Sequence, residues 1–376
     1  MIEAYLDNSA TTQVDERVAR AALSAMCENY GNPSSLHGKG LAAELAVKVA
    51  RGQVAASLGA KDDKIIFTSG GTEANNLALF GSVGSAAKRG MKIVTTAYEH
   101  ASVLQSCEEL AKRGCEVVYI KPSGDGNITV SEVLAAVDER TVLVSVMLVN
   151  NEIGAVLPLE KIARGVRQKN SKTIIHCDAV QAYGKLPIKV KALGVDLLTV
   201  SGHKIYAPKG VGALYVAKGT HLAPLVFGGG QERGLRVGTE AVSGIVALGC
   251  AAELINPVRA QQNTEVLAGS LLAGVQNMRE VHINSPKDAI PSIVNLSIMG
   301  IRSEIMLHYM SERGVFVSSG SACGRNEKSH VLSSMGLKNE VIDSALRISF
   351  GKYNTSEDVA RFITVLKQGI KEIKKQ

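Results

Sequence analysis

The sequence contains no tryptophan and only six phenylalanines, and aromatic residues make up just 4% of it. A nucleic-acid-binding surface would combine a dense basic stripe with aromatic side chains that stack on bases. Here 42 lysines and arginines are intermixed with 35 aspartates and glutamates, which leaves a net charge of +7. This modest surplus predicts no direct contact with nucleic acid.

Cysteines are few, and they show no C-x-x-C pair and no spacing typical of a metal site. In a chain of 376 residues they are expected to be free thiols of a reducing compartment, with no bound metal. No apolar run approaches the ~18 residues that suggest a membrane span, and residues 1–7 lack the basic-then-apolar pattern of a signal peptide. We therefore expect a cytoplasmic protein with no membrane partner.

What the chain does contain is a regular alternation of strand-like and helix-like segments. Short runs rich in β-branched residues are separated by helical lengths, which predicts an α/β fold with a mostly parallel sheet covered on both faces. The strand-like runs are 64–68, 92–97, 116–121, 141–149 and 172–177, and the helix-like segments include 14–30, 36–58, 72–89 and 101–113.

The pattern changes near residue 255, where Ile255-Asn256-Pro257 breaks a long helix. A connecting helix over 258–278 and a final helix from Ser356 are expected to enclose a smaller α+β domain, with strands at 293–298, 315–317 and 346–350. We expect residues 13–257 to form the large domain, and residues 1–12 plus 258–376 to form the small domain.

Two chemically active residues follow predicted strands. Asp178 ends the strand-like stretch 173–177, and Lys204 follows the apolar stretch 195–200 in a Ser-Gly-His-Lys run. Ligands of open α/β sheets gather along the carboxyl ends of parallel strands, so both side chains are expected at one edge of the sheet. An amine and a carboxylate there suit pyridoxal phosphate, which needs an imine link and a charged partner for its ring nitrogen. Either residue alone would be expected on the solvated surface, and only their joint spacing favours the cofactor.

Two further motifs fall at the same predicted edge. The run 67–76 places Gly70-Gly71-Thr72 between a strand and a helix, where free N–H groups and the helix dipole favour a phosphate. By itself this turn favours an ordinary strand–helix connection, because glycine-rich turns are common. His100 follows the strand-like run 92–97 and is suited to lie over a planar cofactor and to transfer protons, although most histidines have structural roles.

Asn150 and Asn151 follow the strand-like segment 141–149, where a side-chain amide either hydrogen-bonds a ligand or forms a turn. Cys323 differs from the other cysteines because the surrounding run 318–328 is polar and rich in glycine and serine, with Arg325 and Lys328 nearby. These surroundings favour an exposed, reactive thiolate.

Together these residues resemble the cysteine desulfurases of the NifS/IscS type, which are class V, fold-type I pyridoxal phosphate enzymes. The likeness extends over nearly the whole chain and is closer to group I, because the Arg-x-Gly-His-His-Cys-Ala run of the short-loop type is absent. The resemblance implies a large, mostly parallel seven-stranded sheet domain and a smaller α+β C-terminal domain. The matching motifs are 5–12, 31–37, 70–76, 150–152, 178–181, 201–204, 228–232, 236–240, 319–323 and 347–351.

The resemblance also implies a role for each matching residue. Lys204 is expected to form the imine, His100 to stack on the ring as an acid/base, and Cys323 to become the persulfide. Asn151 and Arg347 are expected on the substrate side, with Arg347 on the substrate carboxylate. The cofactor is expected to contact Gly71, Thr72, Ser201 and His203 at the phosphate, Asp178 at the ring nitrogen, Gln181 at the ring hydroxyl, Lys204, and Thr239 from the partner subunit of a homodimer.

The implied reaction converts L-cysteine to L-alanine and leaves sulfur on Cys323, for transfer to a protein such as an iron–sulfur scaffold or a tRNA-thiolation protein. No metal is expected beyond a transient contact of Cys323 with an iron–sulfur cluster. The chain departs from the family pattern at Ala207, where glycine is usual after the lysine, and at residues 324–327, which are more charged than usual.

Two alternatives remain open. Another class V enzyme, either an aminotransferase or a selenocysteine lyase, would share Lys204, Asp178 and His100 without an obligate need for Cys323. A catalytically silent scaffold for sulfur-carrier or tRNA-modifying partners would take up no pyridoxal phosphate and would remain colourless.

Overall fold

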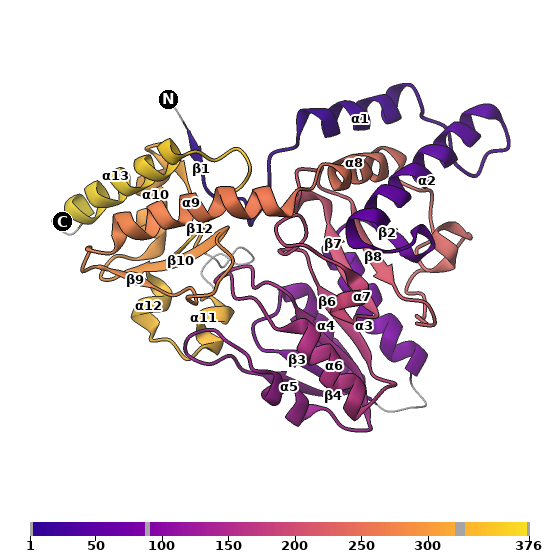
Figure 1. The fold of residues 1–376 in the computed structure, drawn as a ribbon, viewed down its shortest axis with the longest axis horizontal. Helices are drawn as coiled ribbons and strands as arrows, with labels where there is room; N and C mark the ends of the chain where they lie inside the picture. The colour runs from indigo at the N-terminus through magenta and orange to yellow at the C-terminus, as the bar shows by residue number, and fades with distance from the viewer. Residues whose placement is uncertain (1–2, 87–90, 320–327, 374–376) are drawn as a thin grey trace.

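A seven-stranded sheet forms the centre of the larger part of the molecule in the computed structural model, which describes residues 3–86, 91–319 and 328–373 (Figure 1). Neighbouring strands in the order β7-β6-β5-β3-β4 are parallel, whereas β8 pairs antiparallel with β7 and with the edge strand β2. The predicted mostly parallel sheet is therefore confirmed. Its strands are β2 (Ile65–Thr68), β3 (Lys92–Thr96), β4 (Glu116–Ile120), β5 (Thr141–Met147), β6 (Ile174–Asp178), β7 (Leu197–Ser201) and β8 (Gly212–Val216).

Strand β8 is the one strand of this sheet that the predicted strands do not include. Its direction follows from the connection before it, because residues 202–211 contain only the 3₁₀ turn η2 (Gly202–Lys204) and no crossover helix. Parallel pairing needs a crossover of about a dozen residues or more, usually a helix, so a short link of this kind returns the chain antiparallel.

Helices cover both faces of this sheet, and successive strand residues point to opposite apolar clusters. In β8, Ala213 and Tyr215 pack into the cluster that includes residues of α2, α6 and α8, whereas Leu214 and Val216 pack against α3 and α4. Burial on both faces explains why the strands are nearly continuous apolar runs. The helices of this part are α1 (Glu16–Cys27), α2 (Gly38–Leu58), α3 (Gly71–Ala86), α4 (Ala101–Lys112), α5 (Val130–Ala136), α6 (Leu159–Lys169), α7 (Val190–Leu193) and α8 (Val242–Glu253).

A three-stranded antiparallel sheet in the order β12-β10-β9 forms the second part, and helices α9, α10 and α13 pack with it around a separate apolar cluster. The N-terminus joins this part, since β1 pairs in parallel with β11 and Leu6 lies in the same cluster. The predicted domain limits stay a prediction. The elements are β1 (Ala4–Tyr5), α9 (Pro257–Val275), β9 (Val281–Ile283), β10 (Ile293–Ile298), α10 (Ser303–Ser311), β11 (Val315–Phe316), α11 (His330–Ser334), α12 (Asn339–Asp343), β12 (Ala345–Ser349) and α13 (Ser356–Ile373).

Among the described residues, no single helix has the length and apolar character needed to span a membrane. Only α8 and α9 taken together would meet that requirement, and they are bent by 74° relative to each other.

The outer edge of β2 is closed by an ion pair in which the carboxylate is buried and the arginine side chain is 21% exposed. Glu232, in the 3₁₀ turn η3 (Gln231–Gly234), accepts a hydrogen bond from the Phe67 N–H at 2.9 Å and pairs with Arg51 at 2.6 and 2.8 Å. Arg51 also donates to the Ile65 carbonyl at 2.8 Å, and the Glu232 side chain is only 2% exposed. An edge strand otherwise presents unpaired backbone groups, so this pair both protects the edge and anchors the segment that leads to Thr239.

Replacing Arg51 with methionine would leave the Glu232 carboxylate buried without its cation. We expect the free energy of unfolding to fall by about 3 kcal/mol, as for other broken buried pairs. The control Arg20→Met removes an ion pair with Glu16 in which both side chains are 77% exposed. It is expected to cost less than about 0.5 kcal/mol. Urea unfolding followed by circular dichroism measures both effects, and equal losses in the two variants would contradict the assigned role of the pair.

Candidate active site

A cavity of about 690 Å³ collects residues from the carboxyl ends of β3, β5, β6 and β7, together with β12 of the second sheet. This is the sheet edge at which open α/β folds bind ligands. The predicted site residues that line the cavity are Gly71, Thr72, His100, Asn151, Asp178, Gln181, Ser201, His203, Lys204 and Arg347.

Asp178 is the last residue of β6, and its carboxylate is held from two sides. Oδ2 accepts a hydrogen bond from Asn75 Nδ2 at 2.8 Å, and Oδ1 accepts one from the Val180 N–H at 2.9 Å. The same Asn75 nitrogen donates to Ser102 Oγ at 2.9 Å. These contacts fix the carboxylate at the end of its strand and connect it to the first turn of α4.

His100 caps the N-terminus of α4 with its own side chain. Nδ1 accepts a hydrogen bond from the Ser102 N–H at 3.2 Å and lies 2.8 Å from Ser102 Oγ. A backbone N–H only donates, so Nδ1 is an acceptor and the proton of the neutral ring is assigned to Nε2. Burial lowers the pKa of His100, and Lys204 lowers it further against the opposing effect of Asp178. The ring is therefore neutral near pH 7, and Nε2 is the nitrogen that holds the proton.

Helix α3 begins at Gly71, which places the N-terminus of a 16-residue helix at the cavity wall. Its free N–H groups and positive dipole end favour an anion, and the Thr72 hydroxyl adds a donor. A Cβ atom at Gly71 would lie 2.9 Å from Val180 Cγ2. Glycine is therefore needed here because the helix start approaches the segment after β6 too closely for a side chain.

Ser201 immediately precedes the turn η2, His203 lies within it, and the turn ends at Lys204. Burial, and secondarily the neighbouring Lys204, lowers the pKa of His203 to about 4, so its ring is neutral. Lys204 Nζ donates to the carbonyls of Ser9 at 2.5 Å and Ala10 at 2.7 Å. The N-terminal segment thus closes one side of the space around the lysine amine.

Arg347 enters the cavity from β12, and its side chain is only 2% exposed. It donates to the Asn151 carbonyl at 3.0 Å and pairs with Asp7 at 2.9 Å. Within the part of the chain that the structure describes, Arg347 Nε and Asn151 Oδ1 are buried without a hydrogen-bond partner. Buried polar atoms are normally paired, so the guanidinium is prepared for a ligand that accepts hydrogen bonds, such as a carboxylate.

One predicted site residue that the structure describes, Thr239, is not among those that line the cavity. Thr239 is exposed on the segment after η3, and its contact with a partner subunit stays a prediction. Cys323 lies outside the described residues. Lys328 and His330, which follow in the chain, do line the cavity, and His330 Nε2 lies 2.9 Å from the Glu99 carbonyl oxygen.

The predicted site omits three residues that hold the others in place. Asn75 was identifiable in principle, because it lies one helical turn after Gly71 and so shares its face of α3. Ser102, two positions after His100, matches the spacing of a helix cap. Asp7 has no such local signal, since its partner Arg347 lies 340 positions away.

Ala207 stands where glycine is usual in the family that the sequence resembles, and its backbone is not left-handed. The left-handed conformation falls on the preceding residue Tyr206 instead, with φ 70°, and is also found at Glu232 and Arg233. Because the backbone of Ala207 is not left-handed, its buried methyl group introduces no backbone strain.

Residues 4–362 match the family model of aminotransferase class-V. The chain belongs to this family.

A cysteine desulfurase IscS of Methanosarcina thermophila is 40% identical over 375 residues, which cover 98% of this chain and 92% of that protein. A solved NifS-like protein has a TM-score of 0.93 and 38% identity over 100% of both chains. SspA, solved in complex with cysteine, has a TM-score of 0.83 and 35% identity over 94% of this chain and 100% of its own. The predicted resemblance to NifS/IscS-type proteins and the predicted fold class are confirmed.

The class-V cavity fits pyridoxal phosphate by its donor set. It combines a helix N-terminus, a primary amine, a carboxylate at a strand end and a neutral histidine from four different elements. Arg347 and Asn151 also line the cavity, and each keeps one buried polar atom without a hydrogen-bond partner among the described residues.

Glu99 is a fully buried carboxyl group next to His100. One oxygen accepts hydrogen bonds from the Thr96 hydroxyl and, at 2.9 Å, from the Met147 N–H. Burial raises the pKa of Glu99 to about 8, against the opposing effect of these hydrogen bonds. The carboxyl group is therefore mostly protonated near neutral pH.

The folded state binds the Glu99 proton more tightly than the unfolded chain does, so its contribution to stability falls as pH rises from about 4.5 to about 8. Glu99→Gln has no proton to lose. We compare the free energy of unfolding of this variant with that of the wild type. The difference between them is expected to change in favour of the variant by a few kcal/mol when the pH rises from about 5 to about 8.5. Urea unfolding at the two pH values measures the change, with the exposed Glu265→Gln as control. Parallel pH profiles for Glu99→Gln and the wild type would show that Glu99 does not titrate in this way.

Proposed function

We propose that this class-V protein is a pyridoxal phosphate-dependent cysteine desulfurase, which converts L-cysteine to L-alanine and holds the released sulfur as a persulfide on Cys323. The observation that carries the proposal is the convergence of Lys204, Asp178, His100 and the N-terminus of α3 on one cavity. The relative named as a cysteine desulfurase and the SspA structure with bound cysteine support this choice of substrate.

Bound pyridoxal phosphate supplies an electron-withdrawing ring that stabilises negative charge on the carbon atoms of an attached amino acid. Lys204 provides the amine for its attachment. Asp178, held by Asn75 and the Val180 N–H, provides the negative charge for the ring nitrogen. The N-terminus of α3 and the Thr72 hydroxyl bind the phosphate.

Arg347 is proposed to bind the substrate carboxylate, because its buried guanidinium keeps one N–H without a partner among the described residues. The ion pair with Asp7 and the hydrogen bond to the Asn151 carbonyl orient the guanidinium before any ligand arrives. His100 and Lys204 are the proposed proton carriers: His100 holds a proton on Nε2, and Lys204 offers an amine at the same cavity.

The sulfur step uses the Cys323 thiolate as the nucleophile. It attacks the substrate sulfur, so that a sulfur–sulfur bond forms and the substrate carbon–sulfur bond breaks. The electron pair of the broken bond goes to the substrate carbon, which takes up a proton to become the methyl group of alanine. One thiol and one cysteine therefore give one persulfide and one alanine, and no external oxidant is needed.

Two substitutions test the amine and the thiol separately. Lys204→Ala is expected to lose the visible absorption of the bound cofactor, because its attachment point is gone. Cys323→Ala should keep that absorption and lose alanine production by at least ~100-fold, because no nucleophile remains. Absorption spectra and alanine assays measure both, with the exposed Cys27→Ala as control. Normal alanine production by Cys323→Ala would refute the role of this cysteine and favour another class V activity.

We propose that the persulfide sulfur passes to another protein, either an iron–sulfur scaffold or a tRNA-thiolation protein. The IscS name of the relative from Methanosarcina thermophila favours the scaffold. Transfer of ³⁵S from the loaded enzyme to each purified acceptor distinguishes the two.

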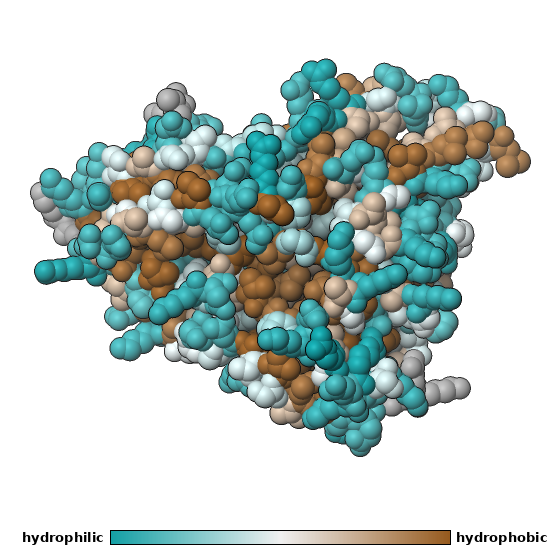
Figure 2. Space-filling model, viewed as in Figure 1, coloured by the Kyte–Doolittle hydropathy of each residue, from teal (hydrophilic) through white to brown (hydrophobic). Residues whose placement is uncertain are grey.

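We also propose that the chain forms a homodimer through helix α2, which has two apolar stripes. Ala43, Val47 and Val54 are buried in the core. On the opposite side Leu41, Leu45 and Val49 recur every four residues and are 53%, 52% and 61% exposed. Figure 2 shows apolar side chains gathered over the end of the arm formed by α1 and α2, where Tyr30 and Leu36 are exposed too. An exposed apolar stripe of this kind marks an interface, and the same stripe on a second copy is a self-complementary partner.

Leu45→Glu places a charge in the middle of this stripe. We expect the dimer to dissociate at least ~10-fold more readily, because the carboxylate would be desolvated in the interface. The control Val266→Glu introduces the same charge on α9, where Val266 is 64% exposed, and should leave the assembly unchanged. Sedimentation equilibrium measures both variants, and a wild type that sediments as a monomer would refute the homodimer.

A further inference from the structure

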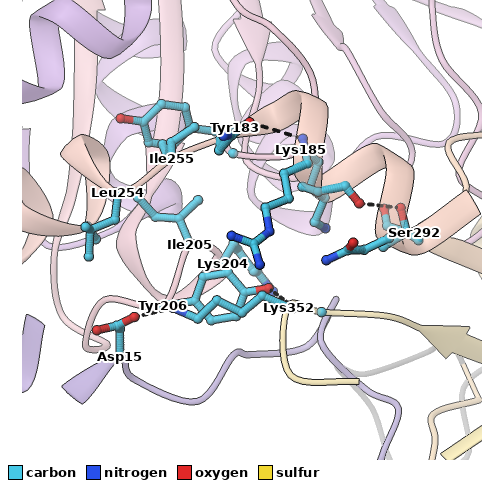
Figure 3. A pocket seen from close by; sticks show the side chains of 18 of the residues that line it. Asp15, Tyr183, Lys185, Lys204, Ile205, Tyr206, Leu254, Ile255, Ser292 and Lys352 are labelled. Atoms are coloured by element: carbon cyan, nitrogen blue, oxygen red, sulfur yellow. Dashed lines mark hydrogen bonds and ion pairs between the residues drawn. The ribbon is translucent and has the colours of Figure 1, made fainter. Parts of the chain in front are cut away.

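Lys185 lies between two cavities. It lines a second cavity of about 460 Å³, which is bounded by the segment before α1, by α9 and by the segment after β12 (Figure 3). Its amine nevertheless contacts a residue of the first cavity, since Lys185 Nζ donates to Gln181 Oε1 at 2.8 Å. The two residues lie four positions apart in the turn that follows β6.

This contact determines how the Gln181 amide is oriented. In its charged form the Lys185 amine only donates hydrogen bonds, and in that form the atom that it contacts is the amide oxygen. On the other side, Gln181 Nε2 donates to the Ser9 carbonyl at 2.9 Å, and a carbonyl only accepts. Both partners therefore assign the same orientation. Ser9 uses one of the two hydrogens on Nε2, which leaves the second for a ligand in the first cavity.

Packing does not require an amine at position 185. Ile205, Leu254 and Ile255 line the same second cavity and make part of its wall apolar (Figure 3). Lys185 makes no ion pair with the described residues, and burying an amine without an anion costs free energy. Burial, together with Lys204 and Arg347, lowers the pKa of Lys185 to about 7.

We propose that Lys185 is a positioning residue that holds the Gln181 amide with its nitrogen toward the cofactor, so that Gln181 donates to the ring hydroxyl. The inference rests on the proposed function, because the ring hydroxyl belongs to pyridoxal phosphate. The amine also polarises the amide and strengthens Nε2 as a donor. A donor and a positive charge beside the ring disfavour its more protonated form. Their loss therefore raises the pH at which the absorption of the bound cofactor changes.

The test is a pH titration of the visible absorption of the holoenzyme. Lys185→Met, which has similar length without the amine, is expected to raise the midpoint by about 0.5 to 1 pH unit. Lys185→Arg keeps a cation and hydrogen-bond donors. Its midpoint is expected to rise by less than half as much as that of Lys185→Met. Lys191→Met removes an exposed lysine of α7 and is expected to leave the midpoint unchanged. Should Lys185→Met fail to fold, Lys185→Leu, which also lacks a donor, replaces it with the same expectation.

A double-mutant cycle separates positioning from a direct effect of charge. Gln181→Leu alone should raise the midpoint. The further shift caused by Lys185→Met in the Gln181→Leu background should be less than half of the shift that Lys185→Met causes in the wild-type background. Additive shifts would show that Lys185 does not act through Gln181 and would overturn the proposal, as would an unchanged midpoint in Lys185→Met. A wild type that takes up no pyridoxal phosphate would instead refute the proposed function.

Discussion

The site depends on the parallel alignment of β3, β5, β6 and β7. Because these strands run in one direction, their carboxyl ends meet at one edge, where the chain leaves the hydrogen-bonded sheet and side chains are free to face a cavity. His100, Asp178 and Lys204 each follow or end one of these strands. A single antiparallel strand among them would move one of these groups to the opposite edge, and β8 shows the effect, since it contributes no residue to the cavity.

A second set of residues decides how these groups are presented. Asn75 bridges the Asp178 carboxylate and Ser102, and Ser102 in turn bonds the His100 ring. Burial keeps both His100 and His203 neutral, so the positive charge near the cavity belongs to lysines and to Arg347. An anionic ligand therefore meets fixed hydrogen-bond donors, including Arg347 and Lys204. The arrangement is suited to a ligand with a phosphate at one end and a carboxylate at the other.

The sequence pattern predicted much of this site because its elements are local. The strands β3, β6 and β7 are short apolar runs, and the polar residues that follow each run are visible without a structure. Strand β8 (Gly212–Val216) was not predicted, and its direction is set by the short connection before it rather than by its own residues. Element boundaries differ from the predicted ones by up to three residues, and β10 (Ile293–Ile298) lies where it was predicted. Asp178, predicted to end its strand, is the last paired residue of β6. Thr239 keeps a role that is predicted by resemblance alone, and the role of Cys323 rests on its surrounding sequence and on the resemblance.

The sequence by itself determined the α/β class, the strand ends that bear reactive groups and the glycine turn at the start of α3, because each depends on residues close together in the chain. Only the tertiary structure decided that Arg347 pairs with Asp7, that Ser9 and Ala10 close around Lys204, and that Lys185 contacts Gln181 from a separate cavity. The physical reason is that hydrogen bonds and ion pairs depend on distance in space. Two polar residues hundreds of positions apart, or in a turn of unknown shape, have no pattern that reveals their partners until the sheets are packed together.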